Sequence, residues 1–224
     1  RQTDRQTDRQ TDRQTDRQNL IKLLQYVFGY AVVKLSDVAM YSKDRILSDK
    51  LNADNYVGVD NILPNRMGKK RAEYIPSTGS CTKYNCSDIL IGNIRPYLKK
   101  IWYADNSGGT NGDVLDIRVC DSDIVLSKYL FYILSSDSFF NYDVQNSKGA
   151  KMPRGNKDAV MNYWFSIPDI EMQRQIISIL DRFDKLCNDI SEGLPAEIEA
   201  RQKQYEYYRD KLLTFKKKEA AENE

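Results

Sequence analysis

The sequence predicts an α+β fold, in which a mixed α/β head is followed by a C-terminal helical region. Between residues 45 and 75, short apolar runs alternate with Asn, Asp, Gly and Pro, a pattern typical of strands joined by turns. After residue 168 the apolar residues are spaced four and three apart, which is typical of helices that pack through a narrow seam. With 224 residues, of which 41% are hydrophobic, the chain can form one substantial domain and an accessory element.

The composition argues against several kinds of catalytic site. Histidine is absent, which removes the usual general base, the usual metal ligand and every Ser-His or Cys-His relay. The cysteines lack the spacing of paired zinc ligands, and we interpret them as reduced thiols of a cytoplasmic protein: Cys81, Cys86, Cys120 and Cys187. We recognise no signal peptide and no apolar run near the ~20 residues that cross a bilayer, so no membrane partner is expected. Because the formal net charge is only +2, a basic surface must come from local clustering.

Residues 1–18 are four copies of Arg-Gln-Thr-Asp followed by Arg17 and Gln18. They contain no apolar residue, and their i,i+4 pairs join identical residues, so we predict that they are disordered. A four-residue period is also what a four-base DNA repeat encodes, and we hypothesise a slippage-prone tract that switches expression on and off (phase variation). The alternative is a repeat kept for its protein properties. Mixed synonymous codons in the gene would contradict slippage.

Residues 19–168 form the predicted head. Asn19 is expected to cap a short helix that ends near Gly29. The remaining pattern predicts strands at residues 32–39 (running into a turn), 56–59, 89–91 and 114–119, a turn at 63–66 and a helix at 126–140.

Three segments of the head concentrate positive charge. Residues 68–71 form a dense basic run, residues 95–102 mix cations with Tyr97 and Trp102, and residues 147–157 form a Gly/Pro loop with four cations and no acidic residue. Cations beside aromatic residues at strand ends suit a phosphate-binding face. A purely cationic loop repels itself unless a polyanion or solvent screens it. The alternatives are solvated loops without a partner or, for residues 148–157, a contact that holds the helical region against the head.

The helical region spans residues 169–216 and is followed by a charged tail at residues 217–224. Its two apolar seams cannot be buried by either helix alone, so they need each other, a sheet or another chain. Arg201 interrupts the second seam, where a charged residue can fix register or strand number. We predict a helix–helix or partner interface formed by Ile176, Leu180, Phe183, Ile190, Leu194, Ile198, Arg201, Tyr205, Tyr208, Leu212 and Phe215.

Several motifs occur in an order that resembles the DNA-specificity subunit of type I restriction–modification systems. They are Lys34-Leu35-Ser36-Asp37-Val38-Ala39, residues 92–100 (GNIRPYLKK), residues 149–156 (GAKMPRGN), residues 167–176 and the helical stretch 191–213. The resemblance covers roughly residues 20–216 and leaves the repeat outside.

The resemblance implies a target-recognition domain with a twisted, largely antiparallel sheet, followed by a conserved helical spacer. It implies a non-catalytic subunit that binds no cofactor itself. Its expected partners are double-stranded DNA, a methyltransferase subunit that uses S-adenosylmethionine, and a restriction subunit that uses ATP and Mg²⁺. The expected DNA-contacting residues are Lys69, Lys70, Arg71, Lys83, Arg95, Lys99, Lys100, Asn111, Lys148, Lys151, Arg154, Asn156 and Lys157.

Members of this family carry two recognition units, whereas this sequence contains one. It therefore resembles a half subunit, which either pairs with a second copy or second half through its helices or results from a frame change in a longer gene. An alternative of another class is an interaction or regulatory adaptor, which occupies the methyltransferase without reading DNA.

Overall fold

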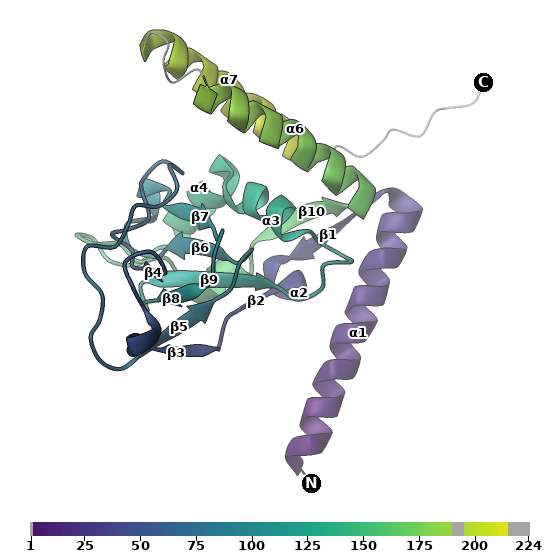
Figure 1. Ribbon diagram of the computed structural model, residues 1–224. Coiled ribbons are helices and arrows are strands. Elements are labelled where there is room, and N and C mark those ends of the chain that lie inside the picture. The colour runs from purple at the N-terminus through teal and green to yellow at the C-terminus, as the bar shows by residue number, and fades with distance from the viewer. Residues whose placement is uncertain (1, 190–194, 215–224) are drawn as a thin grey trace.

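The computed structural model describes residues 2–189 and 195–214, with side chains described at residues 15–185 and 200–214. A head of sheets and short helices lies between two helical elements, the N-terminal helix and a C-terminal helical pair (Figure 1). The helices are α1 (Gln2–Phe28), α2 (Leu35–Val38), α3 (Ser127–Leu134), α4 (Asp137–Asn146), α5 (Lys157–Met161), α6 (Ile170–Asp189) and α7 (Pro195–Leu213). Two 3₁₀ turns are η1 (Ser48–Lys50) and η2 (Pro96–Leu98).

The described strands form three small sheets, and the predicted antiparallel character is confirmed. They are β1 (Tyr30–Lys34), β2 (Ala39–Tyr41), β3 (Arg45–Leu47), β4 (Tyr56–Val57), β5 (Ser80–Tyr84), β6 (Ile89–Gly92), β7 (Ile101–Tyr103), β8 (Gly108–Thr110), β9 (Val114–Val119) and β10 (Trp164–Pro168). One sheet has the order β2-β9-β6-β7, another β3-β5-β8-β4, and β1 pairs with β10. The pair β4–β8 is parallel, and the other pairs are antiparallel.

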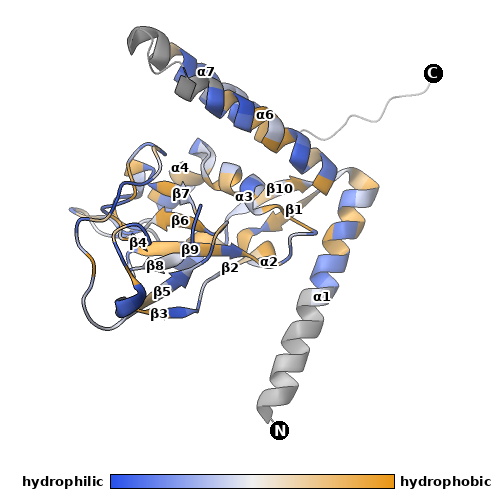
Figure 2. Ribbon diagram, in the orientation of Figure 1, coloured by the Kyte–Doolittle hydropathy of each residue, from blue (hydrophilic) through white to orange (hydrophobic). Residues whose placement is uncertain are grey.

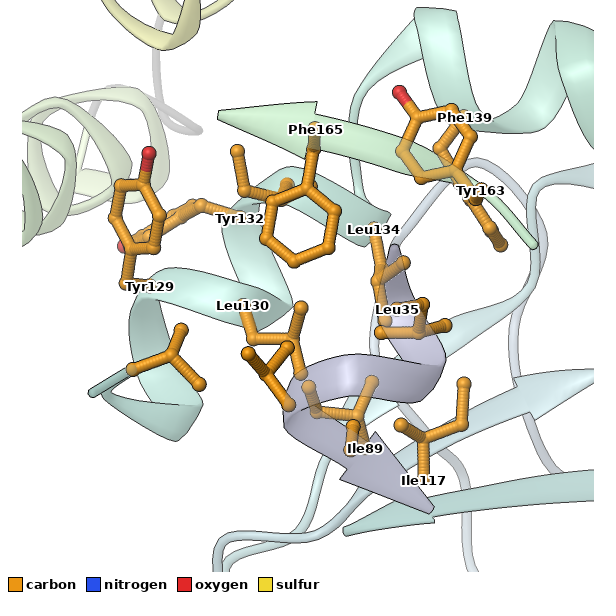
Figure 3. Packing of buried hydrophobic residues seen from close by; sticks show 14 of the residues in the cluster. Leu35, Ile89, Ile117, Tyr129, Leu130, Tyr132, Leu134, Phe139, Tyr163 and Phe165 are labelled. Atoms are coloured by element: carbon orange, nitrogen blue, oxygen red, sulfur yellow. The ribbon is translucent and has the colours of Figure 1, made fainter. Parts of the chain in front are cut away.

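The main core lies between the β2-β9-β6-β7 sheet, α3, α4 and the β1–β10 pair. Ile89 and Ile117 of the sheet, Leu35 of α2 and Leu130 of α3 are all fully buried there, and Figure 3 shows these side chains facing one another. Tyr129 is also buried, and its hydroxyl donates to the Ser166 carbonyl at 3.1 Å. The many tyrosines of this chain therefore include core residues that satisfy their polar ends internally.

The N-terminal repeat differs from the prediction. Residues 2–28 form one helix, so the disorder predicted for residues 1–18 is corrected from residue 2 onward, and Asn19 lies inside the helix rather than at its cap. The repeat also places Arg and Asp three residues apart, where opposite charges support a helix. Because a helix that is already formed extends at low cost, residues 20–28 can propagate into the repeat. The predicted helix end is right, since Gly29 has φ +79°.

The helix predicted at residues 126–140 is two helices. The break lies at Ser135 and Ser136, and Ser136 caps α4 by accepting a hydrogen bond from the Phe139 amide at 3.2 Å. The apolar pattern continues through the break because both helices face the same core. The periodicity could therefore not show the cap.

Two buried glutamines join the helices to the head. Gln173 of α6 donates to the carbonyls of Ile124 and Pro168 at 2.8 and 2.9 Å, and its Oε1 accepts from the Leu126 amide at 2.8 Å. Gln25 of α1 donates to the same Pro168 carbonyl at 2.8 Å. Figure 2 shows hydrophobic and hydrophilic residues alternating along α6, as expected for a helix with one buried face. The start of α6 and the end of α1 are thus fixed to the end of β10.

Candidate nucleic-acid interface

Two of the basic segments lie side by side in the structure. Lys148 and Arg154 pair through their backbones, with N–O distances of 2.9 and 2.8 Å, so residues 148–154 form a small hairpin. The Arg95 amide donates to the Pro153 carbonyl at 2.7 Å, and Ile94 bridges to Arg154. The hairpin and the η2 segment therefore form one surface, although Leu98 and Lys148 are 50 positions apart in the sequence.

Gly155 explains the close attachment of the hairpin to the sheet. Its amide donates to the Asn93 carbonyl at 2.9 Å. A Cβ at position 155 would lie 2.6 Å from Asn93 Oδ1 and 2.7 Å from Asp143 Oδ1, so only glycine fits. Asp143 is 1% exposed, and burial raises the pKa of its carboxyl to about 6. The base of the basic hairpin is thus tightly packed against a buried carboxyl group, Asp143, which keeps its proton to a higher pH than an exposed one.

Four of the predicted cations on this surface are open to solvent. Arg95, Lys148, Lys151 and Lys157 are exposed, and no acidic side chain in the described part of the chain pairs with them. Such cations can neutralise phosphates without first breaking an internal contact. Lys83, on β5, is half-buried.

Other predicted cations have protein partners that take up their charge or their donors. Lys99 pairs with Asp137 at 2.6 Å, and Lys100 donates to the Val59 carbonyl at 2.7 Å. Burial lowers the pKa of Lys100. Arg154 pairs with Asp113 at 3.1 Å, but its side chain is exposed, so a phosphate could replace that carboxylate.

The basic run at residues 68–71 is held on one side of the head. Lys69 donates to the Asp54 carbonyl at 2.7 Å and lies 4.7 Å from the centre of the Trp102 ring. Arg71 pairs with the Asp54 carboxylate at 2.8 Å, and Lys70 pairs with Glu73 at 2.7 Å. The side chains of these last two pairs are exposed, and exposed pairs contribute only about 0–1 kcal/mol each.

The two predicted asparagines have structural roles. Asn156 caps α5, and its Oδ1 accepts from the amides of Asp158 and Ala159 at 3.1 and 3.3 Å. Asn111 Oδ1 accepts from the Asp113 amide at 3.1 Å and so shapes the turn before β9. Both hold the backbone next to the basic surface in place.

Sequence reasoning missed Arg66, which lies in the predicted turn at residues 63–66. Its guanidinium donates to the Ser135 carbonyl and pairs with Asp137 and with Glu206 of α7. Burial alone would raise the pKa of Asp137, but hydrogen bonds from Lys99 and Arg66 hold it below its usual value. The signal available in the sequence was a lone arginine in a turn, which does not reveal distant carboxylates.

The predicted seam residues occupy several environments. Ile176 and Leu180 are buried in the head core, while Phe183 and Tyr205 are half-buried, with ring centres 6.4 Å apart between α6 and α7. On α7, Leu212 is half-buried, Tyr208 is 41% exposed and Arg201 is exposed. Ile190, Leu194 and Phe215 lie outside the described residues, as does the side chain of Ile198.

The cation buried on α7 is Arg209, which the seam analysis missed. It is 1% exposed, stacks on the Tyr205 ring at 5.8 Å and pairs with Asp210 at 2.9 Å. The face of α7 that packs on the head includes Tyr205, Arg209 and Leu212, which follow a four-and-three spacing. The inward face is thus centred on Arg209, and Tyr208 lies nearer solvent.

Among the described residues, no group of three or more Cys, Asp or Glu side chains is arranged to hold a metal ion. The helices in that part of the chain also include none that is long and apolar enough to cross a membrane. A chemical feature that the described surface does offer is the group of open cations, Arg95, Lys148, Lys151 and Lys157.

A family model for the type I restriction modification DNA specificity domain matches residues 29–200. The chain belongs to this family. Members with curated names include the EcoR124I/EcoR124II specificity subunit of Escherichia coli, 39% identical over 99 residues, and the MpnII specificity subunit of Mycoplasma pneumoniae, 40% identical over 120 residues. These matches cover 44% and 53% of this chain but only 24% and 34% of those relatives.

Solved specificity subunits share the fold. The HsdS subunit from Thermoanaerobacter tengcongensis aligns with a TM-score of 0.53 at 19% identity, covering 73% of this chain and 45% of that one. A chain from a structure of type I R-M system assembly aligns with a TM-score of 0.54 at 16% identity, covering 93% of this chain and 55% of that one. The family model confirms the family predicted from the motifs, and the solved structures confirm the α+β fold.

Proposed function

We propose that this chain reads DNA as a non-catalytic specificity subunit, with the open cations of the head as its contact surface. The observation that carries the proposal is the joined surface of the 148–154 hairpin and the η2 segment, where Arg95, Lys148 and Lys151 lack acidic partners in the described part of the chain. Cations in this arrangement bind phosphates, and neighbouring side chains reach base edges. Family membership supports DNA as the polyanion.

The helical elements supply the second half of the proposal. We propose that the chain pairs through α6 and α7 with a second copy or a second specificity half, and so directs adenine methylation, and restriction, to a bipartite target. A two-fold pair of heads would read a symmetric split site. The methyltransferase subunits would use S-adenosylmethionine and the restriction subunit ATP and Mg²⁺, while this chain binds no cofactor.

The test is co-purification with the methyltransferase subunit, followed by methylome sequencing of cells that express both. A new symmetric bipartite adenine motif supports pairing of two identical halves, and an asymmetric one supports a second, different half. Stable co-purification without any new motif would overturn the DNA-reading proposal and favour an adaptor that occupies the methyltransferase. A catalytically inactive methyltransferase is the control for motifs that arise from the host.

A further inference from the structure

Arg66 lies where the head meets α7, and every nitrogen of its guanidinium has a partner. Nε donates to the Ser135 carbonyl at 2.5 Å, Nη1 contacts Glu206 Oε1 at 3.2 Å, and Nη2 pairs with Asp137. The guanidinium also lies 5.6 Å from the centre of the Phe140 ring. A single side chain thus connects the end of α3, the start of α4 and the middle of α7.

The same network holds the loops that carry the basic surface. The Arg66 amide donates to the Lys99 carbonyl at 3.0 Å, and the Asn65 amide donates to the Leu98 carbonyl at 2.8 Å. Lys99 Nζ reaches Asp137, the carboxylate that Arg66 also contacts, at 2.6 Å. Both Arg66 and Lys99 have φ in the left-handed region, at +63° and +50°. Such backbone persists only where the surroundings hold it, so this network fixes both loops.

Burial makes these ion pairs stronger than the exposed pairs of the head. The Arg66 side chain is 12% exposed, and those of Asp137 and Glu206 are 30% exposed. In Lys70–Glu73 the corresponding values are 46% and 83%. Solvent screens the exposed pair more effectively, and the planar guanidinium matches two carboxylates with little loss of freedom.

We propose that Arg66 is a positioning residue that fixes the angle between the head and the helical pair α6–α7 through its contact with Glu206. If two heads read a split target, as proposed above, this angle also sets the separation of the half-sites that they select. That second consequence rests on the proposed function, whereas the joint itself does not. Asp137 pairs both with Lys99, which follows the η2 segment, and with Arg66, which contacts α7. DNA binding at the η2 segment is then coupled to the orientation of α7.

The joint can be tested by the distance between nitroxide labels on Asp49→Cys in the head and Gln202→Cys on α7. Both positions are exposed, the four native cysteines are replaced by Ser, and labelled chain is diluted with unlabelled chain. We expect one narrow distribution for the otherwise unaltered chain and a broader, shifted one for Glu206→Ala. Glu206→Gln, which keeps a hydrogen-bond acceptor but loses the charge, is expected to be intermediate. Glu73→Gln is the matched control and should leave the distribution unchanged.

A Glu206→Ala distribution identical to the starting one would overturn the joint. Equal broadening by Glu73→Gln would also overturn it, because the effect would then not be specific to Arg66. Methylome sequencing of Glu206→Ala adds a separate readout, in which recognition of additional spacer lengths is expected. If the label distances respond but neither the unaltered chain nor any variant directs methylation, the DNA-reading proposal fails while the joint stands.

Discussion

Replacing Lys151 by Ala should weaken DNA binding and reduce its dependence on salt by a calculable amount. Lys151 is exposed at the tip of the hairpin, which is held by backbone bonds between Lys148 and Arg154 that the substitution leaves intact. Each neutralised phosphate contributes about 0.9 to the slope of log K against log[salt]. We therefore expect the slope to fall by ~0.9 for Lys151→Ala and by ~1.8 when Lys148→Ala is added. Arg154→Ala should have a smaller effect because Asp113 already pairs with Arg154 at 3.1 Å.

The assay is fluorescence anisotropy of a labelled duplex across a salt series, with the chain assembled with its methyltransferase subunit. Lys185→Ala on α6 is the control, since it removes an exposed cation of the same kind outside the head. An unchanged slope for the double variant would refute the assignment of the hairpin to DNA contact. The hairpin would then be reassigned to structure. An equal fall for Lys185→Ala would show that the slope reports only net charge.

Three further predictions concern stability and are read by urea unfolding. Gly108→Ala should cost about 3 kcal/mol or more, because a Cβ there lies 1.8 Å from the Asn55 carbonyl oxygen, whereas Gly112→Ala meets nothing within 4 Å and should be nearly neutral. Burial raises the pKa of Asp143 from 3.8 to about 6, so its carboxyl binds a proton more tightly in the folded than in the unfolded state. The free energy of unfolding should therefore fall as the pH rises from about 4 to 7. Asp143→Asn should reduce this fall by about 3 kcal/mol. Ser136→Ala should cost about 1 kcal/mol by removing the cap of α4.

The fold class can be predicted because short stretches of the sequence already show which residues form strands and where a helix ends. Ile89–Leu90–Ile91 and residues 114–119 have the apolar, β-branched composition of buried strands, and both pair in the central sheet. Gly29 ends its helix as expected. The disorder predicted for the repeat is wrong, because Arg and Asp three residues apart support a helix even though the i,i+4 pairs join identical residues.

The candidate site was less predictable because a cation's role depends on residues far away in sequence. Lys99 and Lys151 look alike in the sequence, yet Lys99 is held by Asp137 while Lys151 faces solvent. The same holds for Arg209, whose buried position on α7 depends on packing against the head rather than on helical spacing alone. Composition can therefore locate a basic surface, but tertiary contacts decide which of its charges are available to a ligand.

If the head reads DNA as proposed, the division between ion-paired and open cations limits which residues can change when the target changes. Arg66 and Lys99 lie in the loops that carry the basic surface, yet they bind Asp137 and, through Arg66, Glu206 of α7. A new head that lacked a cation at position 66 would leave Glu206 half-buried without its partner and would lose the joint to α7. Open residues such as Lys151 carry no such constraint, because their loss leaves no buried charge unpaired. We therefore expect changes of target to be tolerated in the hairpin and to be restricted around Arg66.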